Sequence, residues 1–354
     1  MDDLQRLLDD FIAAHPPLAP GVDGMPGVVM HVDAPRAGVR WTGAAGVIER
    51  GGAPLTPDAC FRTASVTKTY VATAVMRLVE QGRLHLTDPL LDHLPVDTAD
   101  LVRRSVAHSP AITVEQVLRH TSGIYDFGTD PTYRRTIGRE PHKVWSAADL
   151  IGIALEHDHP HDPSGVTFHY SDTGYVLLAL MLERATGTGF ASALRALVGL
   201  DVLGLPFTWL EGKEPVPADA PPRAHQYLGA DDTFHFDPSF DGYGGGGLVS
   251  TAGELARFLR ALVDGEVLGR AETAALLDTT TPTDLGELGQ RCGLGIFAST
   301  VEGIERIGHE GFWGIWMYHF PAHDITIAGA HTGLPYDGTA KRALLHGPIR
   351  LLSA

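Results

Sequence analysis

The stretch Phe61-Arg62-Thr63-Ala64-Ser65-Val66-Thr67-Lys68 stands where an apolar helix is predicted to begin and to continue to about residue 82. At a helix start, positions i and i+3 lie on one face, so Ser65 and Lys68 can touch. Serine is a weak nucleophile unless a base lies beside it. The chain has no other S-x-x-K, and the pattern indicates a nucleophilic serine with its base. The plain alternative is a helix N-cap serine followed by a surface lysine.

The expected place of Ser65 in the helix adds to this interpretation. A helix begins at the positive end of its dipole, where free backbone amides can hold a developing oxyanion. Lys68 has to lose its charge to act as a base, which requires a desolvated or cation-rich pocket.

A second candidate segment is Phe168-His169-Tyr170-Ser171-Asp172-Thr173-Gly174-Tyr175, which ends a loop before an apolar helix. A phenol near a cation can ionise in part, so Tyr170 is a candidate general base. Asp172 could accept a hydrogen bond from Lys68 or from a substrate amide. The alternative is a buried aromatic ring, with Asp172 as N-cap of the helix from Thr173.

A third candidate is Gly308-His309-Glu310-Gly311-Phe312-Trp313-Gly314, which is expected between two strands. Glycine lets a substrate backbone approach closely, and His309 could donate a hydrogen bond or shuttle a proton. The alternative is a hairpin turn with a surface histidine.

Strand patterns lie at both ends of the chain and helical patterns in the middle. Residues 27–32 and 39–41 predict a hairpin, because β-branched runs flank a Pro/Gly turn. Further strands are expected at 297–301, 314–320 and 325–330, before a last helix over 341–352. Sequential strands at each end favour an antiparallel sheet with helices packed on it, an α+β fold.

The middle of the chain is interpreted as a helical insertion. Helical pieces are predicted over 113–120, 147–156 and 174–185. Thr113 to Gln116 and Thr251 to Glu254 fit capping boxes, in which side chains satisfy the first free amides of a helix.

Taken together and in this order, the three candidate segments resemble the serine β-lactamase and penicillin-binding protein superfamily. The resemblance is strongest to the branch of D-alanyl-D-alanine carboxypeptidases, class C β-lactamases, D-aminopeptidases and related esterases. Its motifs S-x-x-K, Tyr-x-Asn and His-x-Gly correspond to Ser65–Lys68, Tyr170–Asp172 and His309–Gly311. Further similar stretches are Gly82–Pro89, His120–Gly123 and Gly246–Thr251.

The resemblance covers nearly the whole chain and implies a β-lactamase/transpeptidase-like fold. We therefore expect one catalytic unit over residues 1–354, with an α/β subdomain from 1–70 and 240–354 and a helical subdomain over 71–239. The site is expected in the groove between them.

The resemblance also implies roles for the site residues. Ser65 would attack a carbonyl carbon and form an acyl-enzyme, activated by Lys68 and Tyr170. Tyr170 would pass the proton to the leaving group, and the amides of Ser65 and Phe312 would form the oxyanion hole. His309 would replace the lysine of other branches and support Tyr170 or the substrate.

Substrate contacts are expected from Asp172, Glu310, Gly311 and Trp313, and two of these depart from the family pattern. Asp172 stands where asparagine is usual, and Glu310 stands where a threonine helps to hold a substrate carboxylate. A glutamate would repel that carboxylate by about 1 kcal/mol or more at contact distance. We therefore hypothesise that substrates with a free carboxylate are disfavoured. The alternative is that Glu310 points away and pairs with an arginine.

The predicted function is that of a serine hydrolase acting on amides or esters through an acyl-enzyme, similar to D-alanyl-D-alanine carboxypeptidases, D-aminopeptidases or esterases. Alternatives are an acyltransferase of a biosynthetic pathway, a β-lactamase, or a binding protein that keeps the fold without catalysis. No cofactor or metal is implied, and the expected partner is a small amide or ester.

Two other clusters offer alternatives to this function. His157, His159 and His161 could hold a metal and make the protein a metallo-hydrolase, but their Pro-rich surroundings favour a polar loop. The run Gly244–Gly247 lacks the Lys-Ser/Thr of a phosphate loop, so a flexible approach to the site is expected instead.

Composition excludes other classes of protein. The net charge of −16 over 354 residues, with no basic run, disfavours binding to nucleic acid and to anionic lipid. No run approaches 18 apolar residues, so no membrane insertion is expected. Two distant cysteines, Cys60 and Cys292, exclude a disulfide framework and a zinc finger. The amphipathic start lacks the features of a signal peptide. A cytoplasmic location is therefore expected as the sequence stands, with secretion only if a leader has been removed.

Overall fold

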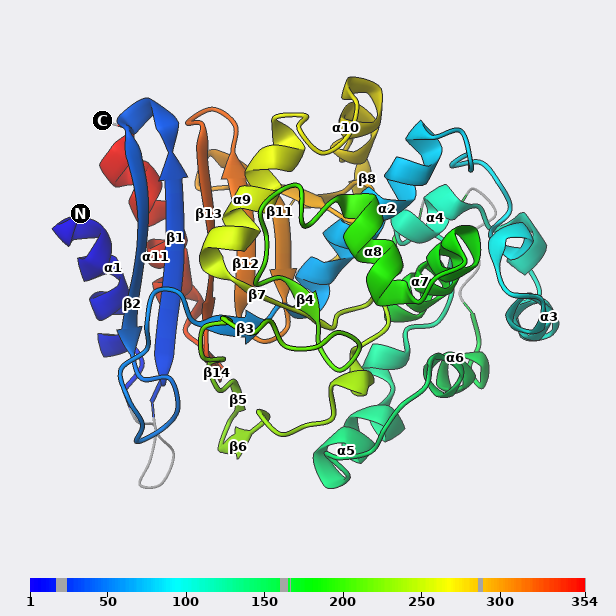
Figure 1. Cartoon of the computed structure of the whole chain (residues 1–354), viewed down its shortest axis with the longest axis horizontal. Helices are drawn as coiled ribbons and strands as arrows, with labels where there is room; N and C mark the ends of the chain where they lie inside the picture. The colour runs from blue at the N-terminus through cyan, green and yellow to red at the C-terminus, as the bar shows by residue number, and fades with distance from the viewer. Residues whose placement is uncertain (17–23, 160–164, 166, 286–288, 354) are drawn as a thin grey trace.

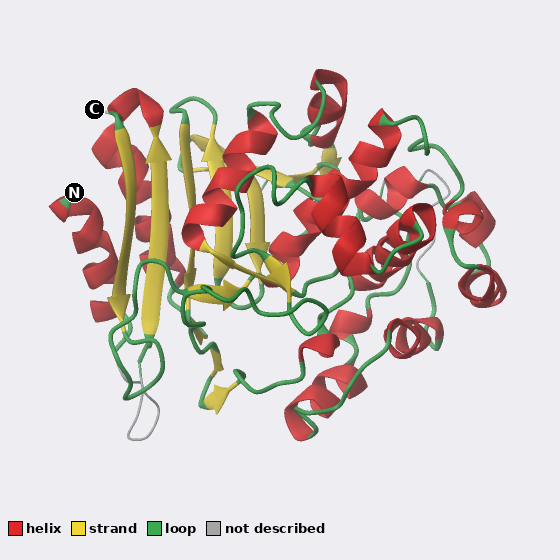
Figure 2. Cartoon of the chain, viewed as in Figure 1, coloured by secondary structure: helices red, strands yellow, loops and turns green. Residues whose placement is uncertain are grey.

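The largest element of the fold is an antiparallel sheet of eight strands, which stands at one side of the molecule with helices beside it (Figures 1 and 2). The computed structural model describes all residues except 17–23, 160–164, 166, 286–288 and 354. In spatial order the strands are β2 (Val39–Gly46), β1 (Gly27–Ala34), β13 (Ile325–His331), β12 (Ile315–Phe320), β11 (Ile304–Gly311), β10 (Phe297–Val301), β9 (Arg291–Cys292) and β8 (Thr281–Pro282).

The predicted hairpin is confirmed as β1 and β2. A single 3₁₀ turn over Pro35–Ala37 reverses the chain, and Gly38 closes it at φ +65°, a conformation that glycine adopts without cost. The strands then pair from Gly27 with Gly46 to Ala34 with Val39. Both strands extend further than the apolar pattern predicted.

The two faces of the sheet carry different cores, because side chains alternate along each strand. On β12, Trp316 and Tyr318 pack against the terminal helices α1 (Asp2–Ala13) and α11 (Gly338–Leu352). Ile315 and Met317 belong instead to the large core that includes α9 (Ala252–Val263).

The helical part of the molecule lies beside the sheet, with α2 (Thr67–Glu80) at its centre (Figure 1). Helix α2 is apolar and buried around most of its circumference, as expected for a helix surrounded by others. The remaining helices are α3 (Val96–Ser105), α4 (Val114–Leu118), α5 (Pro131–Arg139), α6 (Ala147–Leu155), α7 (Asp172–Thr186), α8 (Phe190–Val198) and α10 (Arg270–Leu276).

Two small sheets connect the parts. The first has the order β3 (Cys60–Arg62), β7 (Leu248–Thr251), β4 (Trp209–Leu210), and the second β14 (Gly333–Leu334), β5 (Tyr227–Leu228), β6 (Asp231–Asp232). Strand β3 runs directly into the turn that holds Ser65.

Several local predictions need correction. The helix predicted from residue 65 begins as a 3₁₀ turn over Ala64–Val66, and α2 starts at Thr67. His309 lies on β11 rather than between strands. Helix α7 is capped by Ser171, which accepts from the amide of Gly174 at 3.2 Å, and not by Asp172.

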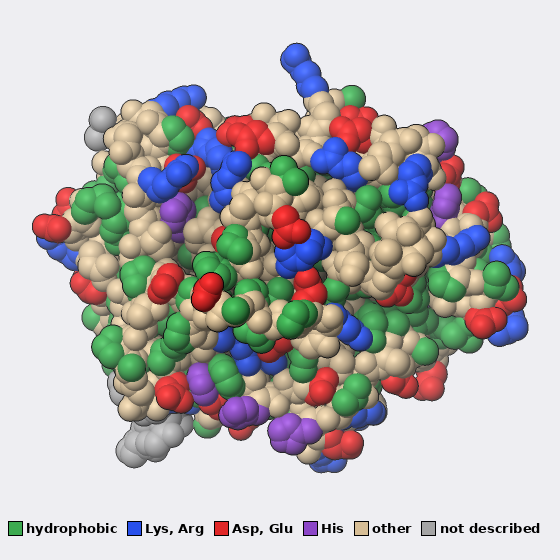
Figure 3. Space-filling model, in the orientation of Figure 1, with side chains coloured by type: hydrophobic (Ala, Val, Ile, Leu, Met, Phe, Trp, Pro, Cys, Tyr) green, Lys and Arg blue, Asp and Glu red, His purple; other side chains and the backbone are tan. Residues whose placement is uncertain are grey.

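The α+β prediction is confirmed, and the strands of the large sheet come only from residues 27–46 and 281–331 among those described. The subdomain boundaries at 71 and 239 stay predictions. None of the described helices is long and apolar enough to span a membrane. On the face shown in Figure 3, acidic and basic side chains are interspersed and form no basic patch.

The contact between α1 and the sheet can be tested with Leu8→Ala. Leu8 is fully buried among Trp316, Leu344 and other members of the second core. Because the cavity cannot close completely, we expect the free energy of unfolding in urea to fall by about 2–5 kcal/mol. Val202→Ala, at a 92% exposed position, is the control and should change it by less than about 0.5 kcal/mol. Equal effects of the two variants would contradict this packing.

Candidate active site

Ser65 stands on a strained turn between β3 and α2. Ala64 before it has φ +46°, a left-handed conformation that costs a non-glycine residue roughly 1–2 kcal/mol. The turn is held by Thr63, whose amide and hydroxyl both donate to the carbonyl of Leu248, at 2.8 and 3.0 Å. A rigid support therefore presents the Ser65 hydroxyl.

The Ser65 hydroxyl oxygen accepts two hydrogen bonds, from Lys68 Nζ at 3.1 Å and from the Tyr170 hydroxyl at 2.8 Å. The fold thus brings two of the predicted segments together at one atom, although 105 residues separate Ser65 from Tyr170. Their contact is shown by the geometry, and their catalytic roles stay predictions.

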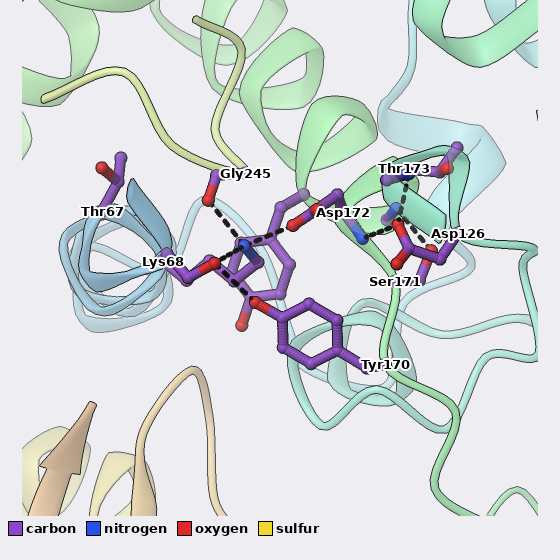
Figure 4. A network of polar contacts seen from close by, with 12 residues as sticks. Thr67, Lys68, Asp126, Tyr170, Ser171, Asp172, Thr173 and Gly245 are labelled. Atoms are coloured by element: carbon purple, nitrogen blue, oxygen red, sulfur yellow. Dashed lines mark hydrogen bonds and ion pairs between the residues drawn. The ribbon is translucent and has the colours of Figure 1, made fainter. Parts of the chain in front are cut away.

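Lys68 is fully buried and surrounded by acceptors (Figure 4). Its ammonium lies 2.5 Å from Asp172 Oδ1 and donates to the carbonyl of Gly245 at 2.5 Å. Burial alone would lower the pKa of Lys68, but Asp172 and Tyr170 outweigh it and raise that pKa above its usual value. Of the two environments expected for Lys68, the pocket is the desolvated one, and its charged neighbour is the anionic Asp172 rather than a cation.

Two further carboxyl groups lie around this ion pair. Asp126 accepts from the backbone amide of Asp172 at 3.0 Å (Figure 4). Burial, and then the charge of Asp172, raises the pKa of Asp126 to about 7, and the same two causes raise the pKa of Asp241 to about 7. At neutral pH, both carboxyl groups are therefore partly protonated rather than fully ionised.

Tyr170 is a neutral phenol in this arrangement. Burial raises its pKa, the Lys68 ammonium lowers it, and Asp172 raises it again, so that the pKa lies above its usual value. With Lys68 charged and Tyr170 protonated, both groups donate to Ser65. One of them must lose its proton before it can accept the proton of Ser65.

His309 lies in the same buried region, and its Nε2 nitrogen can only accept a hydrogen bond. Its Nδ1 lies 2.6 Å from the carbonyl of Glu310, which can only accept, so Nδ1 carries the proton. Its Nε2 is buried without a hydrogen-bond partner among the described residues. Burial, and then Lys68, lowers the pKa of His309 to about 3. This geometry disfavours proton shuttling and shows no hydrogen bond between His309 and Tyr170 within the described part of the chain.

The end of β11 comes close to the turn that carries Ser65. A Cβ added at Gly311 would lie 2.4 Å from the carbonyl oxygen of Thr63, so only glycine permits this approach. Phe312 follows directly, and the proposed oxyanion hole from the Ser65 and Phe312 amides fits the proximity of the two segments. The Phe312 ring is 59% exposed.

Trp313 does not have the position expected of a substrate contact. Its side chain is only 6% exposed and packs edge-on against Phe240, with ring centroids 6.2 Å apart. The expectation for Trp313 is corrected on this ground, and the exposed aromatic ring of this segment is that of Phe312.

Glu310 points to the opposite face of the sheet from His309, because neighbouring residues of a strand alternate. Its carboxylate accepts from the Tyr318 hydroxyl at 2.6 Å and from Lys341 Nζ at 2.9 Å. Burial raises the pKa of Glu310, but Lys341 and the hydrogen bond from Tyr318 outweigh burial. The pKa of Glu310 therefore lies below its usual value, and the group stays ionised. The hypothesis that Glu310 repels a substrate carboxylate is thereby corrected, and its partner is a lysine rather than the arginine of the alternative.

The glycine run Gly244–Gly247 lets its backbone come close to α7 and to the Lys68 ammonium. Gly244 has φ +79°, and a Cβ added there would lie 2.4 Å from the carbonyl oxygen of Tyr175. One added at Gly245 would lie 3.1 Å from Asp172 Oδ1. Bare backbone is therefore what brings the Gly245 carbonyl to the Lys68 ammonium.

The histidines considered as metal ligands have other partners. His157 Nε2 lies 2.9 Å from Asp130 Oδ2, and His159 Nδ1 accepts from the amide of Tyr125 at 3.1 Å. His161 lies outside the described residues. Within the described ranges, no three His, Cys, Asp or Glu side chains form a metal-binding group.

Comparison with known proteins identifies the family of this chain. The sequence matches the family model described as Beta-lactamase over residues 13–346, so the chain belongs to the Beta-lactamase family. This family is part of the β-lactamase/transpeptidase superfamily of serine hydrolases, and the resemblance seen in the sequence is confirmed.

Two sequence relatives and one solved structure show how similar the chain is to individual proteins. Protein Rv1367c of Mycobacterium tuberculosis is 30% identical over 325 residues, which are 78% of each chain. Esterase EstB of Burkholderia gladioli is 33% identical over 165 residues, 44% of this chain and 40% of its own length. The crystal structure of a D-stereospecific amidohydrolase from Streptomyces sp. superposes with a TM-score of 0.82 at 26% identity, over 98% of both chains.

The sequence patterns assign no role to three residues around this site. Asp126 and Asp241 follow no motif and come near Lys68 and Asp172 only in the folded chain. His120 lies within a stretch similar to the family, but that similarity gives it no role. Gly245 belongs to the glycine run expected to approach the site, although the run does not show that its carbonyl contacts Lys68.

The charge of Asp172 can be tested with Asp172→Asn. Asp172 raises the pKa of both Lys68 and Tyr170, so its removal should let either base lose its proton at lower pH. We expect the acid limb of the labelling rate of Ser65 by a fluorophosphonate probe to move down by about 1–3 pH units. Asp201→Asn, at an exposed aspartate, is the control. An acid limb that stays in place or moves up would contradict the assignment.

The corrected role of Glu310 can be tested with Glu310→Thr. Because Glu310 faces Lys341, the ratio of 4-nitrophenyl acetate to 4-nitrophenyl succinate hydrolysis should change by less than about twofold. Stability should fall instead, since Lys341 loses its partner. The difference in stability between wild type and Glu310→Thr should decrease as the pH falls through the lowered pKa of folded Glu310. Below that pKa, the wild-type carboxylate is protonated and no longer pairs with Lys341.

Glu305→Thr, on the same strand and 58% exposed in its side chain, is the control for Glu310→Thr. It should leave both the substrate ratio and the stability near the wild-type values. A shift of about tenfold towards the succinate ester in Glu310→Thr alone would restore the original hypothesis.

Proposed function

We propose that the protein hydrolyses amides or esters through an acyl-enzyme on Ser65, and that it prefers neutral or amine-bearing substrates to those with a free carboxylate. The observation that carries the proposal is the Ser65 hydroxyl, which is held by both Lys68 and Tyr170 on a rigid turn. A nucleophile within hydrogen-bond reach of its base is the arrangement that acyl transfer to serine requires.

In the proposed reaction, Lys68 or Tyr170 first releases its proton to solvent. The proton of Ser65 then passes to that group while the oxygen attacks the substrate carbonyl carbon. The carbonyl oxygen becomes an oxyanion held by the amides of Ser65 and Phe312. Protonation of the leaving amine or alcohol releases it and leaves an ester on Ser65. Water then attacks this ester with the same groups in reverse roles and frees the acid.

The charges around Ser65 support the substrate preference. The Lys68 ammonium is already paired with Asp172, and two more carboxyl groups, Asp126 and Asp241, lie close by. Within the described residues, Lys68 is the only lysine or arginine in contact with the Ser65 hydroxyl. Such a site offers little to a substrate carboxylate and attracts an ammonium group. The structural relative above is named a D-stereospecific amidohydrolase, which supports amides as the first class of substrate to test.

None of the three relatives above is named for acyl transfer to a biosynthetic acceptor, and water is therefore the acceptor proposed here. A β-lactamase or a binding protein without catalysis stays as an outcome of the experiment below.

The proposal is tested by labelling and turnover of wild type and Ser65→Ala. The wild type should hydrolyse D-phenylalanine amide or 4-nitrophenyl acetate and take up one fluorophosphonate adduct at Ser65 by intact mass. Ser65→Ala should lose the adduct and at least about 10³-fold of the turnover. Ser192→Ala, at an exposed serine of α8, is the control and should match wild type.

The same measurement separates the alternatives. Benzylpenicillin should give neither a stable adduct nor hydrolysis, because the one cation that contacts the Ser65 hydroxyl among the described residues, Lys68, is already paired with Asp172. A penicillin adduct on Ser65 would overturn the substrate preference and favour a penicillin-binding or β-lactamase function. Absence of any adduct with the fluorophosphonate in folded wild type would overturn the hydrolase itself and favour a binding protein.

A further inference from the structure

His120 lies directly behind Tyr170 and contacts three consecutive residues of that segment. Its carbonyl accepts from the amide of His169 at 2.7 Å. Its ring stacks on that of Tyr170, with centroids 4.3 Å apart and planes 24° from parallel. Its Nδ1 lies 3.1 Å from the amide nitrogen of Ser171. One residue therefore holds the backbone before Tyr170, the ring of Tyr170 and the backbone after it.

The hydrogen bond to Ser171 determines the tautomer of His120. A backbone amide can only donate, so Nδ1 accepts and the proton of the neutral ring is on Nε2. His120 is 1% exposed, and its Nε2 has no hydrogen-bond partner within the described part of the chain. Burial, followed by the charge of Lys68, holds the pKa of His120 well below its usual value, so the ring stays neutral and Nδ1 stays an acceptor.

Neither backbone nor packing alone explains a histidine at this place. His120 follows the end of α4 at φ +56°, where glycine or asparagine is favoured over a larger side chain. A phenylalanine would stack on Tyr170 without burying an unpaired N–H. What histidine adds over phenylalanine is the Nδ1 acceptor for Ser171, and what it adds over asparagine is the ring.

We infer that His120 is a positioning residue, which holds the Tyr170 hydroxyl within hydrogen-bond reach of Ser65 and, through the Ser171 amide, fixes the start of α7. The inference rests on the proposed function, because it assigns the effect of His120 to the reactivity of Ser65. His120 itself makes no contact with the Ser65 hydroxyl in the described structure, where Lys68 and Tyr170 are its partners.

The experiment compares two variants that each keep one half of the contacts. His120→Phe keeps a ring to stack on Tyr170 and loses the acceptor for Ser171. His120→Asn keeps an acceptor and a residue suited to positive φ, and loses the ring. For each variant, the rate of fluorophosphonate labelling at Ser65, kcat and KM for 4-nitrophenyl acetate, and the urea unfolding midpoint are measured.

We expect labelling and kcat to fall by about 10-fold to 100-fold in both variants, with KM within about threefold of wild type, because Tyr170 is displaced and substrate binding is not. His319→Asn is the control, since His319 is buried on β12 and hydrogen-bonded to Thr326 instead. It should change the unfolding midpoint but leave the labelling rate of the folded protein at the wild-type value.

The inference is overturned if the folded variants label within about twofold of wild type, or if activity is lost through KM while kcat is retained. A residue that only stabilises the fold would lower the unfolding midpoint and produce the first of these results. If His120→Phe does not fold, His120→Asn decides the question by the same criteria. Wild type that takes up no probe would instead contradict the proposed function, which distinguishes the two failures.

Discussion

The buried ion pair between Lys68 and Asp172 is the interaction on which the rest of the site depends. An ammonium group with no exposure to water cannot stay in the protein interior without a counter-charge and hydrogen-bond acceptors. Asp172 provides the charge and the Gly245 carbonyl an acceptor, so that α2, α7 and the glycine run meet at one nitrogen atom. Removing one member of such a pair typically costs about 3–5 kcal/mol, because the other charge is then left buried alone.

The same ion pair sets the chemistry of Ser65. Asp172 pairs with Lys68 where the related motif has an asparagine, and it raises the pKa of both Lys68 and Tyr170. Asp126 and Asp241 add two carboxyl groups whose pKa values of about 7 leave them partly protonated at neutral pH. Several protons are thus held near the Ser65 hydroxyl, and the proposed attack by Ser65 requires that Lys68 or Tyr170 first loses one of them.

Much of the fold and the first two candidate segments could be predicted from sequence, because they rest on local rules. The hairpin of residues 27–46 follows from β-branched runs around a Pro/Gly turn, and the contact of Ser65 with Lys68 follows from helical spacing. Local rules did not resolve the segment of His309 and Glu310. It has the glycines of a turn but forms a strand, because β10 and β12 provide partners on both sides.

The sequence by itself determined the family and the α+β class, and it predicted the contact of Ser65 with Lys68, since a motif of fixed spacing carries that information along the chain. Only the tertiary structure decided which face each later residue occupies and which charges surround Lys68. Strand alternation places His309 and Glu310 on opposite faces of the sheet. On its own face, the Glu310 carboxylate pairs with Lys341, which lies 31 residues further along the chain. Such pairings depend on distances between elements that are remote in sequence, and no local spacing encodes them.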